Sequence, residues 1–253
     1  MGCRLWTKSV SDTVRWRVRY ILYLADLLYH SKGGFIMLIK QRLMRFIFSP
    51  YALKKSVTTR LALMGLATAV MYVANAFLEV KFLDVQFSLT IVLSCATGCV
   101  LGPLSGFTVC VLADFLGWLA NSSGFIYMPW VGLSTGLNAL LGGIFLGFDY
   151  AEFKGGKALK CALFILASFL GCTVAVNSTG FYFYNKAMGF STAVVNYVAE
   201  RFGGEGVSYF AYLVYRLIFK GQIYNSAVNY ALVAIFYAWF TKASDSGFFK
   251  QIF

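Results

Sequence analysis

Long runs without charged side chains alternate with short polar stretches along most of this 253-residue chain. A helix needs about 20 apolar residues to cross a membrane. Between Val85 and Phe148 the only charged side chain is Asp114, which leaves room for three crossings. Turn-forming residues divide this region after Leu101 and at Asn121. Over the whole chain, the pattern predicts six spans at about 61–78, 85–101, 106–121, 127–148, 161–180 and 221–241.

The predicted fold class is an all-α integral membrane protein, a bundle of six transmembrane helices. Residues 57–242 would form the membrane-embedded domain, in which residues 181–220 make an extracellular cap with some helix. Residues 1–56 would form a basic cytoplasmic or interfacial extension, and residues 243–253 a short cytoplasmic tail. An alternative for the extension is that Met37 is the true start.

Composition and charge support this assignment and orient it. The chain is 59% hydrophobic and 13% charged, about half the usual share of charge in a soluble domain. Its net charge is +12, and 12 of the 22 Lys and Arg residues lie in the first 60 positions. Placing both termini in the cytoplasm puts 17 Lys and Arg residues inside and five outside, in agreement with the positive-inside rule. We therefore expect a multi-pass membrane protein, and no nucleic-acid partner.

Several kinds of chemistry lack the residues they need. One His and six scattered Cys give no metal-ligand cluster. The string nearest to a phosphate-binding loop, Gly155-Gly156-Lys157-Ala158, lacks the first Gly and the final hydroxyl of that motif. We expect no metal, no bound cofactor and no ATP hydrolysis by this chain alone. Uphill transport would need an ion gradient or another subunit.

Polar groups in apolar surroundings are the candidate functional residues. Asp114 could contact a substrate or carry a proton, or it could be a structural carboxyl bonded to Ser134 or Asn138. Other candidates lie near the outer ends of the spans, where aromatic rings, amides and cations suit a flat, aromatic, anionic solute. An aromatic belt with snorkelling cations is the alternative interpretation. The candidate substrate-binding residues are Asn75, Asp114, Tyr127, Trp130, Asn177, Arg216 and Lys220.

Small residues on the first span suggest a helix-docking face. Ala62, Gly65 and Ala69 lie about one turn apart, which lets another helix approach closely. They could serve packing within the chain or docking onto a partner.

Several motifs together resemble a known family. They are the turn Leu101-Gly-Pro-Leu-Ser-Gly-Phe107, an Asp-x-x-Gly ending at Gly117, a Tyr-x-Pro at 127–129, Asn177-Ser-Thr179 and Arg216-Leu-Ile-Phe-Lys220. Over residues 56–242 the chain resembles the substrate-binding S component of energy-coupling factor (ECF) vitamin transporters, and its folate branch in particular. Two features depart from that branch: Trp130 stands where a small residue is usual, and 185–213 resembles an insertion.

The resemblance implies a receptor of the bacterial plasma membrane and not an enzyme. An S component captures a vitamin at the outer face and works with a transmembrane scaffold (T) subunit and two cytoplasmic ATPases. For folate, it implies that Arg216 and Lys220 hold the glutamyl carboxylates, that Tyr127 and Trp130 stack on rings, and that Asn177 or Asp114 bonds the pterin edge. Ala62, Gly65 and Ala69 would then dock on the scaffold. Alternatives are another ligand (riboflavin, cobalamin or a queuosine precursor), an ion-coupled secondary transporter, or a membrane-embedded enzyme.

Overall fold

The computed structural model describes residues 43–77, 80–82, 85–120, 126–147, 156–203 and 206–245. The chain divides into two compact units, Met1–Met44 and Arg45–Phe253. Leu43 and Met44 are the only described residues of the first unit, so most of the expected basic extension lies outside the described residues. All that follows concerns the second unit.

The first half of the second unit holds a small hairpin between helices. The elements are α2 (Pro50–Leu53), α3 (Val57–Phe77), β1 (Val80–Phe82), β2 (Val85–Phe87), α4 (Thr90–Leu101), α5 (Pro103–Ala120) and α6 (Pro129–Phe145). The strands are antiparallel, with Lys81 opposite Gln86.

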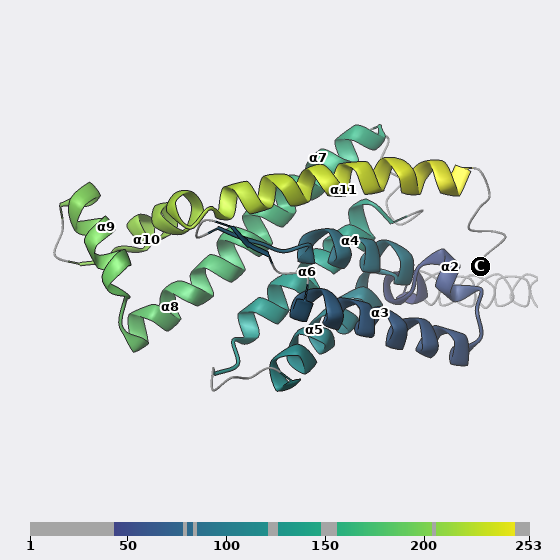
Figure 1. Ribbon diagram of the computed structural model, residues 1–253. Coiled ribbons are helices and arrows are strands. Elements are labelled where there is room, and N and C mark those ends of the chain that lie inside the picture. Colours follow the sequence, from purple (N-terminus) through teal and green to yellow (C-terminus); the bar gives the residue numbers. More distant parts are fainter. Residues whose placement is uncertain are drawn as a thin grey trace, which may run out of the picture. The chain divides into compact units, whose positions relative to one another are not determined.

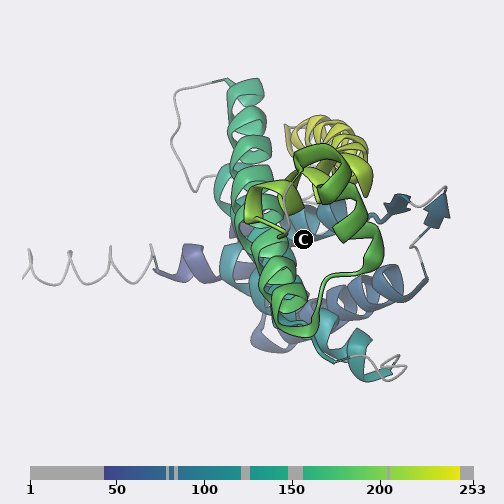
Figure 2. The ribbon, with the colours of Figure 1, turned by 90° about the vertical axis from the view of Figure 1, so that its left-hand side faces the viewer.

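The second half is built on two long helices joined by shorter ones. The elements are α7 (Lys157–Ala167), η1 (Ser168–Ser178), α8 (Thr179–Met188), α9 (Thr192–Phe202), α10 (Tyr209–Val214), η2 (Tyr215–Phe219) and α11 (Gln222–Asp245). The first three form one continuous 32-residue helix, of which η1 is a π-helical segment. Figure 1 shows α8, α9 and α10 at one end of this unit and α2 at the other, and Figure 2 looks onto the α8–α10 end.

The helices differ from the expected spans in two places. The second expected span begins as strand β2, because residues 80–87 pair as a hairpin, and its helix starts only at Thr90. The fifth continues beyond residue 180 to Met188, so part of the expected cap is a helical extension of that span. Residues 181–220 also contain α9 and, over Tyr209–Phe219, α10 and η2, while the extracellular position of this segment stays a prediction.

Three helices of the described chain are long and apolar enough to cross a membrane: Val57–Asn75, Pro103–Ala120 and Lys157–Met188. Large apolar side chains on their outer faces are exposed, among them Leu66 (64%) and Leu170 (53%), while polar side chains such as Asn138 are buried. An apolar exterior around a partly polar interior is the pattern of a membrane protein. The full count of six spans and the cytoplasmic termini stay predictions.

Glycine and proline set the tight turn between α4 and α5. Gly102 ends α4 with φ of 116°, a conformation that side chains with a Cβ rarely adopt. Pro103 then occupies the first position of α5, where its missing N–H costs nothing. This turn also packs closely on α6, because a Cβ on Gly143 of α6 would lie 2.7 Å from Cα of Pro103.

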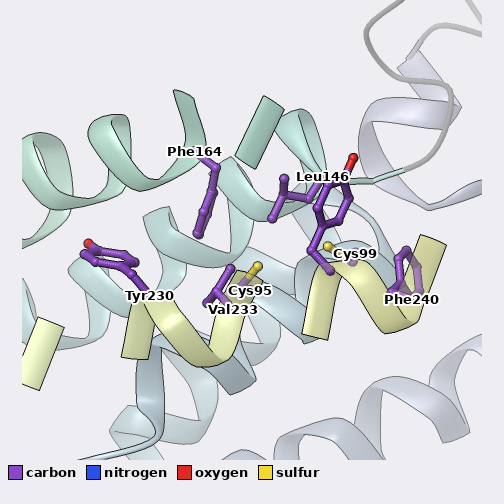
Figure 3. Close-up of a cluster of buried hydrophobic side chains, with 8 residues drawn as sticks. Cys95, Cys99, Leu146, Phe164, Tyr230, Val233 and Phe240 are labelled. Atoms are coloured by element: carbon purple, nitrogen blue, oxygen red, sulfur yellow. The ribbon is translucent and has the colours of Figure 1, made fainter. Parts of the chain in front are cut away.

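A hydrophobic core joins α4, α7 and α11 on the side away from the α8–α10 end. Phe164 of α7 is fully buried and points toward Val233 of α11 and Cys95 of α4 (Figure 3). Tyr230, Tyr237 and Phe240 extend this cluster along α11. The core thus fixes the long helices against α4 and leaves the polar positions beyond it to line a cavity.

Candidate binding site

A cavity of about 330 Å³ lies between the helices of the second unit. Residues from α3, α4, α5, α6, the long α7–η1–α8 helix, η2 and α11 contribute to its walls. Its apolar lining residues are Ile91, Val131, Cys172 and Phe181, and the other described lining residues are polar or charged. We call this space the inner cavity. Such a lining suits a ligand held by several hydrogen bonds.

The π-helical segment η1 gives the cavity one of its walls. Ser168 and Asn177 are nine positions apart, which in an α-helix of 3.6 residues per turn places them on opposite faces. In a π-helix the backbone bonds run from i to i+5, so residues four or five apart lie above one another. Ser168, Thr173 and Asn177 therefore share one face, and all three line the inner cavity.

Arg216 enters the cavity from the second π-helical segment, η2. Its guanidinium carbon lies 4.0 Å from the centre of the Phe181 ring, a cation–π contact. Burial lowers the pKa of the guanidinium, and a hydrogen bond to Tyr212 raises it. Its Nε is buried without a hydrogen-bond partner among the described residues. Arg216 thus brings a positive charge to the cavity wall, and its Nε is an unused donor buried within that wall.

Asn177 presents the complementary group. Its Oδ1 is likewise buried with no partner among the described residues. A buried polar atom without a partner costs about 1–3 kcal/mol, so such atoms are uncommon unless a ligand or water completes them. Both unpaired atoms belong to residues that line one cavity. The wall of the inner cavity therefore holds one donor and one acceptor that no described residue satisfies.

Asp114 lines the cavity from α5 and is held by Tyr127. The Tyr127 hydroxyl donates a hydrogen bond to the carboxylate. Gly132 lets the two groups meet, since a Cβ there would lie 2.7 Å from Oδ2 of Asp114 and 3.0 Å from the Tyr127 hydroxyl. Asp114 is the only acid among the described lining residues.

The alternative partners expected for Asp114 are engaged elsewhere. Ser134 donates to the carbonyl of Cys172 at 3.1 Å. Asn138 is buried, and its Nδ2 donates to the Ser94 hydroxyl at 2.9 Å and to the carbonyl of Ile91 at 3.2 Å. The predicted hydrogen-bond partners of a structural Asp114 carboxyl were therefore wrong. Tyr127, which precedes α6, bonds to this carboxylate instead.

Buried hydrogen bonds connect the cavity to the surrounding helices. The Ser168 hydroxyl donates to Oδ1 of Asn138 at 2.6 Å and lies 3.0 Å from the Tyr230 hydroxyl. These bonds link α6, η1 and α11 through side chains at the cavity wall. A buried network that is satisfied in this way is rigid, so part of the site is preformed.

A second set of bonds ties the start of α4 to the rim. The amide of Asn229 donates to the Ser88 carbonyl at 2.7 Å, and the Ser88 N–H donates to Oδ1 of Asn225 at 3.3 Å. The Thr90 hydroxyl donates to Oδ1 of Asn75 at 3.3 Å. Asn75 therefore lines the cavity while bridging α3 and α4.

The structure brings together only part of the residue set chosen from the sequence. Asn75, Asp114, Asn177 and Arg216 line the inner cavity, and Tyr127 contacts it through Asp114. The two remaining candidates, Trp130 and Lys220, lie outside this lining.

Trp130 packs against α8 instead. Its ring centre lies 5.8 Å from those of Phe181 and Tyr184, and Gly180 makes space for it, because a Cβ there would overlap the indole. The buried indole Nε1 has no partner among the described residues. Trp130 thus packs against Phe181, which lines the inner cavity, and does not itself line that cavity.

Several lining residues were not predicted from the sequence. Ser88, Thr90, Ser168 and Thr173 are small hydroxyl residues within apolar runs, where such residues also satisfy their own helix carbonyls. The α-helical spacing of residues in the sequence did not indicate the lining residues of η1. The wider π-helical turns of η1 change which of residues 173–177 face the cavity.

The docking residues chosen on the first span lie on one open face of α3. Ala62, Gly65 and Ala69 are all exposed, and nothing lies within 4 Å of the position of a Gly65 Cβ. Leu61 and Leu66 beside them are 63% and 64% exposed. In the described chain these small residues are therefore free of internal packing.

Comparisons with known proteins find similarity among solved structures. No protein-family model matches the chain, and no curated protein matches its sequence significantly. Among solved structures, the crystal structure of FolT bound with folic acid is similar, with a TM-score of 0.48 and 19% identity over 71% of this chain and 94% of FolT.

Proposed function

We propose that this chain is the S component of an ECF-type vitamin transporter in the bacterial plasma membrane. It binds a flat, aromatic, anionic vitamin, with folate as the best candidate, in the inner cavity. A transmembrane scaffold (T) subunit and two cytoplasmic ATPases then power uptake. The observation that supports this most is the pair of unpaired buried atoms, Nε of Arg216 and Oδ1 of Asn177, beside one cavity in an apolar helix bundle.

The lining favours binding over catalysis. General acid–base chemistry usually pairs groups of matched pKa, but the titratable side chains of the described lining are Asp114, Arg216 and the thiol of Cys172. The described residues hold no group of three or more His, Cys, Asp or Glu placed to bind a metal. What the cavity offers is recognition: a guanidinium for a carboxylate, and Asp114 and Asn177 as acceptors for ring N–H groups.

Equilibrium binding by the isolated chain tests the proposal. The detergent-purified protein is titrated with folic acid, riboflavin, cobalamin and a queuosine precursor while tryptophan fluorescence is recorded. Trp130 packs on Phe181, which lines the cavity, so binding should quench its emission. We expect tight, saturable quenching by folic acid. The variant Trp130→Phe should lose this quenching, while its affinity for folic acid, measured by calorimetry, should stay that of the wild type. Binding of another compound changes the ligand, and binding of none refutes the proposal.

The open face of α3 is the proposed docking surface for the scaffold. Gly65→Leu should leave vitamin binding unchanged, because no neighbour lies within 4 Å of its Cβ position, and should abolish uptake by the assembled transporter. Gly171→Leu is the matched control, since Gly171 on η1 has equally open surroundings. Loss of binding in Gly65→Leu would indicate an internal packing role. Ion-driven transport by the lone chain in liposomes would favour the secondary-transporter alternative.

A further inference from the structure

A second cavity of about 330 Å³ lies beside the inner one, within the helices at the α8–α10 end. We call it the outer chamber. It is lined by Phe181, Asn185, Ser191, Val194, Tyr212, Tyr215, Arg216, Lys220 and Gln222. Phe181, Arg216 and Gln222 also line the inner cavity, so the two spaces adjoin at these side chains.

The outer chamber has a packed frame. Its wall residues Val194, Tyr212 and Tyr215 belong to a buried cluster of α8, α9, α10 and η2. Asn185 is held by two bonds, since its amide donates to the Phe181 carbonyl at 2.7 Å and to the Tyr212 hydroxyl at 3.0 Å. Much of this frame comes from residues 185–213, the segment that departs from the folate branch of the resembling family. The chamber is therefore a built feature of this chain.

Its chemistry is that of an anion site. Arg216 and Lys220 bring two positive charges, and no Asp or Glu is among the described lining residues. The hydroxyls of Ser191, Tyr212 and Tyr215 and the amide of Gln222 add hydrogen-bond donors. Such a set matches carboxylate groups, which accept bonds from all of these donors.

We propose that the outer chamber is a second subsite, which holds the anionic tail of an elongated ligand whose aromatic head occupies the inner cavity. This inference rests on the proposed function and specifies its substrate class. Arg216 contacts both spaces and so marks the junction between head and tail. Lys220, which lies outside the inner cavity, then acts on added tail carboxylates and not on the head. The two cavities together reach the size range of sites for drug-sized ligands.

Affinities for a series of probes test the subsite. The probes are pteroic acid, which lacks the glutamate, folic acid, and pteroyl-triglutamate. We expect the Kd of the wild-type chain to fall along the series. The step from pteroic acid to folic acid, which adds the carboxylates that Arg216 holds, should lower it by about tenfold or more. The step from folic acid to the triglutamate should lower it by about threefold, as for a partly exposed ion pair. Lys220→Gln should remove the gain from folic acid to the triglutamate. Lys186→Gln should keep it, because this exposed cation of α8 lines neither cavity.

A filling variant gives an independent readout. Ser191→Trp should occupy the outer chamber, raise the Kd for the triglutamate and leave that for pteroic acid unchanged. Equal affinity of the wild type for folic acid and the triglutamate would overturn the subsite while the proposed function stands. So would an unchanged series in Lys220→Gln. Binding of no probe at all would overturn the proposed function, and the subsite with it.

Discussion

Replacing Arg216 separates ligand recognition from fold stability more sharply than any other single change. In the unliganded chain the guanidinium has an aromatic contact 4.0 Å from the Phe181 ring and a bond to Tyr212, while Nε has no partner among the described residues. A buried cation costs several kcal/mol of desolvation, and a partner of opposite charge normally offsets that cost. Here we propose that the ligand's carboxylate is the partner of opposite charge, while Phe181 and Tyr212 stabilise the cation in the ligand-free chain.

The expected magnitudes follow from this arrangement. The cation–π contact contributes about 0.5–2 kcal/mol, and the hydrogen bond to Tyr212 contributes about 1.5–3 kcal/mol. Together they roughly cancel a desolvation cost of several kcal/mol, so Arg216→Gln should change the free energy of unfolding by about 1 kcal/mol or less. A hydrogen bond to a charged group is worth about 1.5–3 kcal/mol. At about 1.4 kcal/mol per tenfold, loss of the pair with a carboxylate should raise Kd by roughly 10- to 100-fold.

Calorimetric titration with folic acid and thermal unfolding of the ligand-free protein measure the two quantities. Arg201→Gln is the matched control, since it removes the same charge from an exposed position on α9 that lines neither cavity. The control should bind as the wild type does. A Kd for Arg216→Gln within twofold of the wild-type value would refute the role of Arg216 in the site.

Two further changes test the packing that holds the site, by thermal unfolding in detergent. Gly98→Ala should cost about 3 kcal/mol or more and abolish the folded protein, because the new Cβ would overlap the carbonyl oxygen of Ala139 where α4 crosses α6. Gly180→Ala should cost about 1–3 kcal/mol, since it displaces the ring of Trp130. The control Gly171→Ala has open space around the new Cβ and should unfold at or slightly above the wild-type temperature. A wild-type melting temperature for Gly98→Ala would contradict the close crossing of α4 and α6.

Charge-free runs predicted the positions of the long helices because burying charge in lipid is costly wherever it occurs. The break at Gly102 and Pro103 was also predictable, since glycine and proline in an apolar run usually mark the end of one helix and the start of the next. The hairpin was not, because the alternation in Val80–Phe87 is too short to stand out within apolar sequence. The continuation of the fifth span to Met188 was hidden by aromatic residues typical of a membrane interface.

Candidate site residues were predictable where a polar group interrupts an apolar run. Asp114, Asn177 and Arg216 are of this kind, and the structure places all three on the inner cavity, although their part in binding stays a prediction. The aromatic choice was less reliable. Trp130 suited a stacking role by type, but only the structure shows that Gly180 opens a space for its ring. Ser168 and Thr173 were hidden because the π-helical turns of η1 have no sequence signature.

Ligand binding by the isolated chain tests the central claim most directly. The purified protein, without any other subunit or nucleotide, is titrated with folic acid in a calorimeter. A passive receptor should bind one vitamin per chain with nanomolar affinity, and Arg216→Gln should weaken that binding at least tenfold. Failure of the pure chain to bind any of the four vitamins and precursors, under conditions where it remains folded, would contradict the account.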